Sequence, residues 1–348
     1  MDSLQDKAEP QRRLRVAVVG CGRIARHHAS AYAKVADRFE IVAFVDRDLD
    51  RARLFAEEHG GAAVASVREA REQTELDAVD LCLPPAEHCP EAVGAADLGL
   101  HVLCEKPLAL TCDEVDRMVE AGGRNHVVVM SGQSRRFNGP LRKVKELMDS
   151  AAIGTPLLGF MVSGGRTENL ATPWWGDPAV AGPSLLLYNW GAHFLDWAYY
   201  LYGPPHRLYA EGGDTGGPTA GVDNLSLLLG YEAPLVVTVT WSHAGRVPGC
   251  SGCAGTQGTV EFGGETGVLL NGEPVPNEDR AINQFDTMFR EFHAAVTQGR
   301  EPETSAARCR VVIEMIEAAL RSCASHEPVA ITGQGAVRYP VEPVTRAV

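Results

Sequence analysis

Two short segments hold side chains that can exchange a proton with a substrate. Lys106 lies in Cys104-Glu105-Lys106-Pro107, directly after a β-branched run, and Asn189 and His193 lie four residues apart in a later segment. If that later segment is helical, the two side chains share a face. A neutral imidazole can take a hydroxyl proton and a lysine can hydrogen-bond a substrate oxygen, so these residues predict acid–base catalysis at an oxygen atom. The structural alternatives are a Glu105–Lys106 ion pair in a loop and a core histidine.

Lysine is rare in this chain. Five of the 32 basic residues are lysines and the other 27 are arginines, a bias that suggests a GC-rich, actinobacterium-like genome. Because arginine keeps its proton in proteins, each remaining lysine is a candidate for a role that arginine cannot fill. Lys106 is such a candidate, since it follows a predicted strand at the end where ligands of parallel sheets bind.

A glycine-rich turn predicts a dinucleotide site. Gly20-Cys-Gly22-Arg-Ile-Ala25 follows the first β-branched run, and Asp46 ends the second run 21 residues after Ala25. The turn lets backbone amides approach a pyrophosphate, and a carboxylate at Asp46 can accept hydrogen bonds from the adenosine ribose. NAD is therefore favoured over NADP, although Arg47 could accommodate a 2′-phosphate and Asp46 could instead cap a helix. The cofactor-binding residues predicted here are Gly20, Cys21, Gly22, Arg23, Ile24, Asp46 and Arg47.

Residues 14–131 predict a doubly wound parallel sheet. Five β-branched runs alternate there with amphipathic stretches, which is the pattern of βαβ units. This unit places the glycine turn, Asp46 and Lys106 at the carboxyl ends of its strands. The runs are 15–19, 40–45, 78–83, 101–104 and 127–130, and the helical stretches are 23–36, 49–59, 89–98 and 111–124.

The rest of the chain predicts an α+β unit with a largely antiparallel open sheet. Strand-like runs occur at 157–163, 225–231 and 235–243, and the turn Glu232-Ala-Pro234 joins two of them as an antiparallel pair. Helices are predicted at 140–150, 282–298 and 305–325, and glycine-rich loops at 212–221 and 244–258. We expect a frayed arm at 1–13, a dinucleotide-binding Rossmann domain at 14–133, and a substrate-binding and oligomerisation domain at 134–348.

Composition limits the possible partners. The net charge of −13 disfavours nucleic acid, whose phosphates need a basic face. The apolar runs are strand-sized and residues 1–15 lack an apolar signal segment, so we expect a cytoplasmic protein without membrane spans. Nine scattered cysteines indicate reduced thiols. We therefore expect a small-molecule substrate, and the open sheet offers a face for a homodimer or homotetramer.

These motifs together resemble the Gfo/Idh/MocA oxidoreductase family, which includes glucose-fructose oxidoreductase and inositol dehydrogenase. The resemblance spans Val16 to about Ile331. It implies a substrate bound between the domains, with Lys106 and His193 at the reacting hydroxyl or carbonyl. It also adds Leu83, Pro84, His88, Glu105 and Lys106 to the cofactor-binding residues. The motifs that carry it are the glycine turn, Leu83-Pro84-Pro85 with His88, Glu105-Lys106-Pro107, the segment leading to His193, Gly255-Thr-Gln-Gly-Thr259 and the helix 291–299.

Asn189 departs from this resemblance. The family usually has Asp there, and a run of glycines where this chain has Gly182-Pro183-Ser184. An amide cannot ionise, so the base role moves to His193 or Lys106. The sequence predicts an NAD(H)-dependent oxidoreductase acting on a secondary alcohol of a sugar, cyclitol or amino sugar, for example in aminoglycoside or other secondary-metabolite biosynthesis. A redox-inert NAD-binding regulator and an enzyme that recycles tightly bound NAD are the alternatives.

Other residues have both a functional and a structural interpretation. Arg135 could contact substrate or form an ion pair between domains, and Trp175, next to Trp174, could line the substrate pocket by stacking on a sugar ring. Cys250-Ser-Gly-Cys253 is predicted to be a flexible loop and no metal is expected, because structural zinc usually has four ligands. His27 and His28 are both expected on the surface. The predicted substrate-binding residues are Lys106, Arg135, Trp175, Asn189 and His193.

Overall fold

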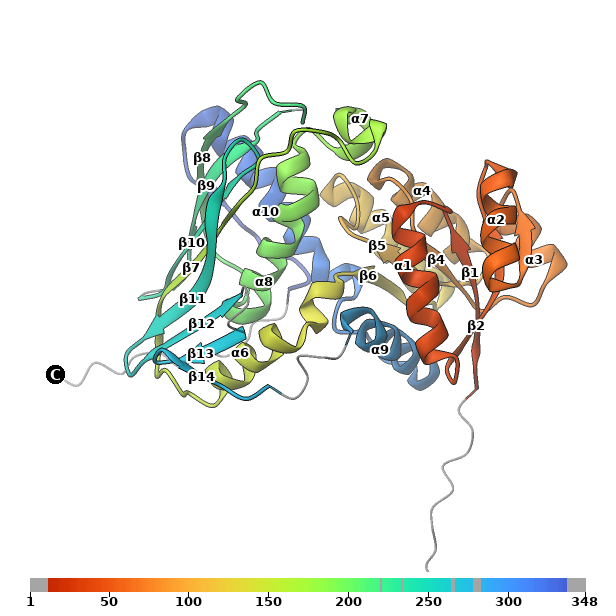
Figure 1. The fold of residues 1–348 in the computed structure, drawn as a ribbon, viewed down its shortest axis with the longest axis horizontal. Helices are drawn as coiled ribbons and strands as arrows, with labels where there is room; N and C mark the ends of the chain where they lie inside the picture. The colour runs from red at the N-terminus through yellow and green to blue at the C-terminus, as the bar shows by residue number, and fades with distance from the viewer. Residues whose placement is uncertain (1–11, 220, 233, 264–266, 278–282, 337–348) are drawn as a thin grey trace, which may run out of the picture.

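The first sheet is parallel and has six strands. The computed structural model describes residues 12–336 apart from 220, 233, 264–266 and 278–282. The strand order of this sheet is β3-β2-β1-β4-β5-β6 (Figure 1). Its strands are β1 (Leu14–Val19), β2 (Phe39–Val45), β3 (Ala62–Val64), β4 (Ala78–Leu81), β5 (His101–Glu105) and β6 (Val129–Gly132).

Helices connect these strands and cover both faces of the sheet. Asp48 caps α2 through a hydrogen bond from the Asp50 amide, and Thr111 and Glu114 form the capping box of α5 that the sequence predicts. The doubly wound fold class is therefore confirmed. The helices are α1 (Arg23–Tyr32) with its 3-10 extension η1 (Ala33–Val35), α2 (Leu49–His59), α3 (Val67–Gln73), α4 (Pro85–Asp97) and α5 (Cys112–Asn125).

The second sheet has nine strands in the order β14-β13-β12-β11-β7-β10-β9-β8-β15. The β7–β10 pair is parallel, whereas the other described pairs are antiparallel, so the largely antiparallel sheet is confirmed. The predicted hairpin between β9 and β10 is present. The strands are β7 (Pro156–Gly164), β8 (Arg207–Gly213), β9 (Asn224–Gly230), β10 (Val236–Ser242), β11 (Val247–Gly255), β12 (Thr259–Gly263), β13 (Gly267–Leu270), β14 (Glu273–Pro274) and β15 (Val329–Ala330).

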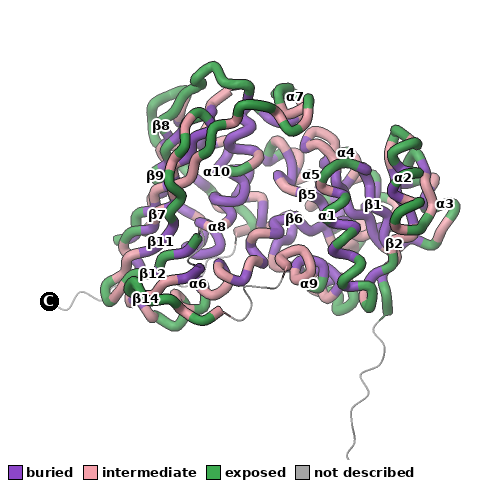
Figure 2. Tube along the Cα trace, viewed as in Figure 1, coloured by how far each residue is buried: buried purple, intermediate pink, exposed green. Residues whose placement is uncertain are grey.

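Helices lie between the two sheets. In Figure 1, α6, α8 and α10 cover the face of the second sheet that is turned towards the first, and Figure 2 shows mainly buried residues along α8 and α10. α9 instead packs on α1, where the rings of Phe289 and Tyr32 stack at 4.1 Å. These helices and short turns are η2 (Ser134–Phe137), α6 (Gly139–Asp149), η3 (Pro173–Gly176), α7 (Pro178–Ala181), the π-helical η4 (Leu186–Gly191), α8 (Ala192–Tyr202), α9 (Gln284–Gln298) and α10 (Ala306–Ser325).

The prediction of a loop at 244–258 is wrong, because this segment contains strand β11. Glycine, proline and cysteine have low strand propensity, but β11 pairs with both β7 and β12, and this tertiary pairing outweighs the local preference. Gly252 shows why a small residue is needed: a Cβ there would lie 2.7 Å from the Phe160 ring and from the Val260 carbonyl oxygen. Cys250 and Cys253 therefore lie on a strand. The short elements β3 and α3 are not among the elements predicted from the sequence.

Among the described residues, every helix is too short or too polar to cross a bilayer.

Candidate active site

A cavity of about 830 Å³ lies at the carboxyl ends of the first sheet's strands, within the usual size range of ligand sites. Its wall also includes residues of the second unit, namely the Trp174–Trp175 turn and the segment from Leu185 to Asn189. The structure thus brings most of the predicted site residues together. Those that line the cavity are Gly20, Cys21, Gly22, Arg23, Ile24, Asp46, Arg47, Leu83, Pro84, Glu105, Lys106, Trp175 and Asn189.

The glycine turn is shaped to hold a pyrophosphate. Gly20 has φ of +91°, and a Cβ there would lie 2.6 Å from the Cys82 carbonyl oxygen, so only glycine fits. Gly22 is the N-cap of α1, makes no side-chain cap, and has no atom within 4 Å of an added Cβ. The first amides of α1 therefore receive no side-chain cap, and phosphates bind at helix starts to amides of this kind. These residues fit a dinucleotide.

Asp46 lies beside this turn at the end of β2. Its Oδ2 accepts a hydrogen bond from the Cys21 amide at 2.8 Å, and its Oδ1 accepts one from the Asp48 amide at 2.8 Å. Both bonds orient the carboxylate at the cavity wall, and each oxygen has a further lone pair for a ribose hydroxyl. Arg47 and Arg51 line the same part of the cavity.

Lys106 and Asn189 meet across the two units. The Lys106 Nζ donates to Asn189 Oδ1 at 2.6 Å and lies 3.4 Å from the Asn189 carbonyl oxygen. Burial is the main cause that lowers the pKa of Lys106 to about 8, with help from the charges of Arg135 and Arg23, while Glu105 opposes it. A lysine with this pKa can donate or accept a proton near neutral pH.

His193 lies in the first turn of α8, four residues after Asn189, so the predicted helix is present with a π-helical first segment. Its side chain is buried, and its Nδ1 has no hydrogen-bond partner among the described residues. Burial, followed by the charges of Lys106 and Arg135, holds the pKa of His193 well below 6.5. The ring is therefore neutral at pH 7. His193 is not among the residues that line the cavity, whose wall reaches Asn189.

A buried ion pair holds α8 in place beneath the site. The Arg136 guanidinium binds both carboxylate oxygens of Asp196, with Nε donating to Oδ2 at 3.0 Å, and both side chains are buried. Gln133 adds a bond to the Ala192 carbonyl oxygen at 3.2 Å. These contacts join η2, which follows β6, to the helix that carries His193.

Two aromatic–arginine contacts border the site. The Arg23 guanidinium lies 5.5 Å from the Trp175 ring centre, which joins the start of α1 to the η3 turn. The Arg135 guanidinium lies 4.7 Å from the Trp190 ring centre. Arg135 does not line the cavity, although its charge acts on both Lys106 and His193.

His88 does not line the cavity, in contrast to its expected place among the cofactor-binding residues. It is fully buried, with Nδ1 2.8 Å from the Pro107 carbonyl oxygen and Nε2 2.9 Å from that of Leu83. Both ring nitrogens thus lie against carbonyl oxygens of the protein, and the neutral ring donates to one of them. His88 joins the two loops that contain Leu83 and Lys106, so its contact with the site is indirect.

Sequence comparisons agree with this geometry. Residues 14–133 match the profile described as an oxidoreductase family with an NAD-binding Rossmann fold, and residues 141–269 match the profile of the GFO/IDH/MocA C-terminal domain. The chain belongs to the Gfo/Idh/MocA oxidoreductase family. The resemblance inferred from the motifs is thereby confirmed, and so is the predicted class of NAD-binding oxidoreductase.

Relatives within the Gfo/Idh/MocA family include two sugar or cyclitol enzymes. The chain is 30% identical to D-apiose dehydrogenase of Paraburkholderia graminis over 68% of this chain and 62% of that protein. It is 34% identical to myo-inositol 2-dehydrogenase of Thermotoga maritima over 57% of this chain and 58% of that protein, so each match spans less than two thirds of the relative. A crystal structure of an oxidoreductase from Thermotoga maritima superimposes with a TM-score of 0.83 and 29% identity, covering 92% of this chain and 98% of that one.

Helix α1 of this Gfo/Idh/MocA protein contains a buried histidine that was predicted to lie on the surface. His28 is fully buried, and only His27 is exposed. Ala25, His28, Ala29 and Tyr32 form the buried stripe of α1 with the spacing i, i+3, i+4 and i+7. This helical period in the sequence predicts that His28 is buried. The fact that His27 and His28 are adjacent indicates only that one of the two faces solvent.

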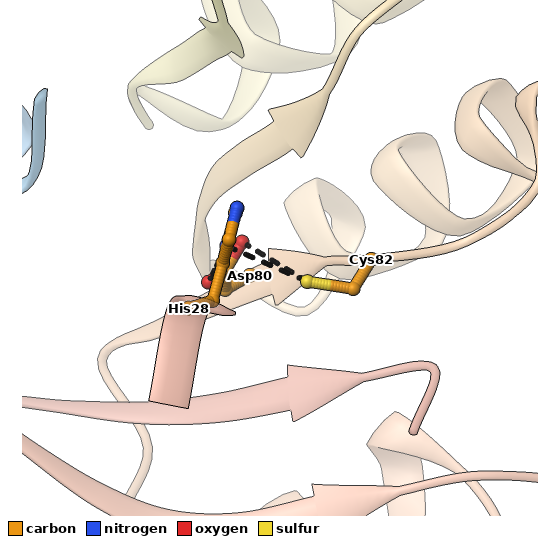
Figure 3. A group of neighbouring side chains, drawn as sticks. All are labelled: His28, Asp80 and Cys82. Atoms are coloured by element: carbon orange, nitrogen blue, oxygen red, sulfur yellow. Dashed lines mark hydrogen bonds and ion pairs between the residues drawn. The ribbon is translucent and has the colours of Figure 1, made fainter. Parts of the chain in front are cut away.

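His28, Asp80 and Cys82 converge, as Figure 3 shows, and have the residue types of a metal site. The His28 Nδ1 lies 2.8 Å from Asp80 Oδ2, and Cys82 Sγ lies 3.5 Å from the same nitrogen. Two ligands of a tetrahedral zinc ion stand about 3.3 Å apart, whereas 2.8 Å is an ordinary hydrogen bond. We therefore assign the group as a hydrogen-bonded network.

Proposed function

We propose that this protein is an NAD(H)-dependent oxidoreductase that interconverts a secondary alcohol and a ketone on a sugar or cyclitol. The observation that carries the proposal is the Lys106–Asn189 contact at 2.6 Å on the wall of the cavity that also contains the glycine turn. The pair supplies an ammonium of lowered pKa beside a dinucleotide-shaped site. The activities of the apiose and inositol dehydrogenases named above support the substrate class.

In this proposal His193 and Lys106 divide the proton transfer. Bound NAD supplies the hydride acceptor. His193 is neutral at pH 7 because of its lowered pKa, so it can take the hydroxyl proton, while Lys106 hydrogen-bonds the same oxygen and stabilises its developing negative charge. Asn189 accepts from Lys106 and cannot ionise, so it positions the ammonium. Trp175, which lines the cavity, borders the substrate, and Arg135 acts on the site through its charge.

Turnover with a substrate panel tests the function. Purified protein is mixed with NAD or NADP and with sugars, cyclitols and aminoglycosides, and reduced nicotinamide is followed by absorbance. We expect turnover with NAD on a neutral polyol. The panel also tests the finer prediction of an amino-sugar substrate from secondary metabolism. Tight NAD binding without turnover on any compound would contradict the proposal and favour a regulator or an enzyme that recycles its cofactor.

Asp46 determines the preference for NAD over NADP in this proposal. Asp46→Asn keeps an oxygen acceptor for the Cys21 amide but removes the charge that repels a 2′-phosphate, next to Arg47 and Arg51. We expect the ratio of the NADPH to the NADH dissociation constant to fall about 10- to 100-fold, or about 1.4–2.8 kcal/mol. Nucleotide fluorescence titration measures both constants. Asp50→Asn is the matched control, since Asp50 is exposed, pairs with Arg53 and does not line the cavity; an unchanged ratio in Asp46→Asn would refute the assignment.

We also propose a homo-oligomer formed through the second sheet. Leu158, Leu228 and Val236 are 47%, 46% and 39% exposed, and Val236 pairs with Leu158 across β10 and β7. No helix among the described residues covers this face (Figure 1). Exposed apolar residues grouped on a sheet are typical of subunit contacts. We also propose that the domains divide at residue 133. A reducing, cytoplasmic compartment is a further part of the proposal, and the nine free thiols support it.

A charge placed on this face is expected to separate the subunits. Leu158→Glu buries a carboxylate against an apolar partner, so the sedimentation coefficient should fall to the monomer value at micromolar concentration. Ala36→Glu adds the same charge on the exposed surface after η1 and should leave the assembly intact. A Leu158→Glu protein that sediments as the wild type does would rule out this interface.

A further inference from the structure

A second charged group lies directly behind Lys106. His28 on α1 bridges two carboxylates: its Nδ1 is 2.8 Å from Asp80 Oδ2 and its Nε2 is 3.0 Å from Glu105 Oε1. All three side chains are buried, and the imidazole ring packs against Phe285 and Phe289 of α9 at centroid distances of 5.2 and 5.4 Å. Figure 3 shows the His28 side chain next to those of Asp80 and Cys82. Catalysis as proposed above does not use this group directly.

The network is ionic. Burial disfavours the charged imidazole most strongly, but the charge of Asp80, the Cys82 side chain and the hydrogen bond to Asp80 together outweigh it, so the pKa of His28 is raised well above 6.5. Burial also disfavours the Glu105 carboxylate, but the hydrogen bond and charge of His28 hold its pKa below the usual value. Two further titratable groups interact with Asp80: Cys82 stays a neutral thiol because burial raises its pKa to about 12, and burial raises the pKa of Tyr32 well above 10. His28 is thus an imidazolium that donates to both carboxylates.

Glu105 connects this network to Lys106. While Oε1 receives the His28 bond, Oε2 accepts the Lys106 backbone amide at 3.0 Å, and the Lys106 side chain continues to Asn189. Gly132 on β6 leaves space for this carboxylate, since a Cβ there would lie 3.1 Å from the Glu105 Cα. The other charges that act on Lys106 are Arg135 and Arg23. This group contains two buried carboxylates, the buried imidazolium and the half-buried Lys106 ammonium, and their charges sum to zero.

We propose that His28 is a positioning residue for Lys106: its charge neutralises Glu105 and its ring fixes the Glu105 carboxylate, so that Lys106 keeps its place and its proton affinity at the reacting oxygen. The inference rests on the role of Lys106 in the proposed function. Without the charge of His28, the Glu105 carboxylate would attract the Lys106 proton more strongly. With no carboxylate at position 105, the charge of His28 would no longer affect the pKa of Lys106.

The titration of Lys106 tests this directly. The chain has five lysines, so protein labelled with [ε-13C]lysine gives few resonances, and Lys106→Arg identifies the Lys106 signal. In His28→Gln we expect the titration midpoint of Lys106 to rise by about one pH unit, which means that Lys106 binds its proton about tenfold more tightly. In Glu105→Gln the midpoint should fall, and the double variant should titrate as Glu105→Gln alone does. The alkaline limb of kcat/KM should move with these midpoints.

Several outcomes would overturn the inference. An unchanged Lys106 midpoint in folded His28→Gln, or shifts that simply add in the double variant, would leave His28 as a core residue only. His293→Gln is the matched control, because His293 is a buried histidine on α9 outside the network and should not move the Lys106 signal. If His28→Gln does not fold, wild-type 15N spectra decide, since a neutral His28 ring at pH 7 refutes the proposal. These titrations need no substrate, so loss of the proposed activity and failure of this inference are read separately.

Discussion

We expect Lys106→Met to lower kcat by about 10³-fold while the dissociation constant for NAD changes only a few-fold. Methionine has nearly the length of lysine but cannot hydrogen-bond or exchange a proton at the reacting oxygen, and such groups contribute about 10²–10⁴-fold to rates. An effect on kcat with little effect on cofactor binding is the signature of an interaction made in the transition state. Steady-state kinetics and a fluorescence titration of NAD measure the two quantities.

Two further variants sharpen the result for Lys106. Lys106→Arg retains the positive charge but not the lowered pKa, so it should remain at least about tenfold impaired. Lys143→Met removes a lysine that pairs with Glu146 on the surface of α6, and it should behave as the wild type does. A Lys106→Met enzyme within a factor of ten of the wild-type kcat would show that the Lys106–Asn189 pair is not the reacting site.

His193→Gln is expected to lower kcat by about 10²-fold or more and to remove one limb of the pH profile. The pKa of His193 lies well below 6.5 in the folded protein, so the base is protonated only at low pH and is ready above that pKa. In the wild type, kcat/KM for alcohol oxidation should rise as His193 loses its proton and fall as Lys106 titrates near pH 8. The acidic limb should be absent in His193→Gln.

The control for this profile is His326→Gln, which removes an exposed histidine that pairs with Glu211 far from the cavity. Its profile should superimpose on that of the wild type. Persistence of the acidic limb in His193→Gln would assign that limb to another group and would move the base role to Lys106.

The local rules of the sequence were enough to predict the dinucleotide half of the site. The tight turn at Gly20, the uncapped start of α1 and the position of Asp46 after β2 depend on backbone conformation and strand–helix order, which neighbouring residues largely determine. For the same reason the helix at 49–59 begins and ends where its period and caps predict. The family motifs led to the prediction that Lys106 and His193 act on the substrate.

Contacts between distant segments were decided only by the tertiary structure. The Lys106–Asn189 bond joins residues 83 positions apart, and its geometry depends on how the two sheets and α8 pack. β11 is a strand because β7 and β12 pair with it on either side. His88 lies between the carbonyl groups of two neighbouring loops, so its ring does not reach the cavity. His28 could be placed inside from the period of α1, but its charge could not be predicted. The charge of His28 depends on the carboxylates of Asp80 on β4 and Glu105 on β5, which surround the ring in a dry interior. Electrostatic attraction is strong there, and the residues next to His28 in the sequence do not show that these carboxylates are close to it.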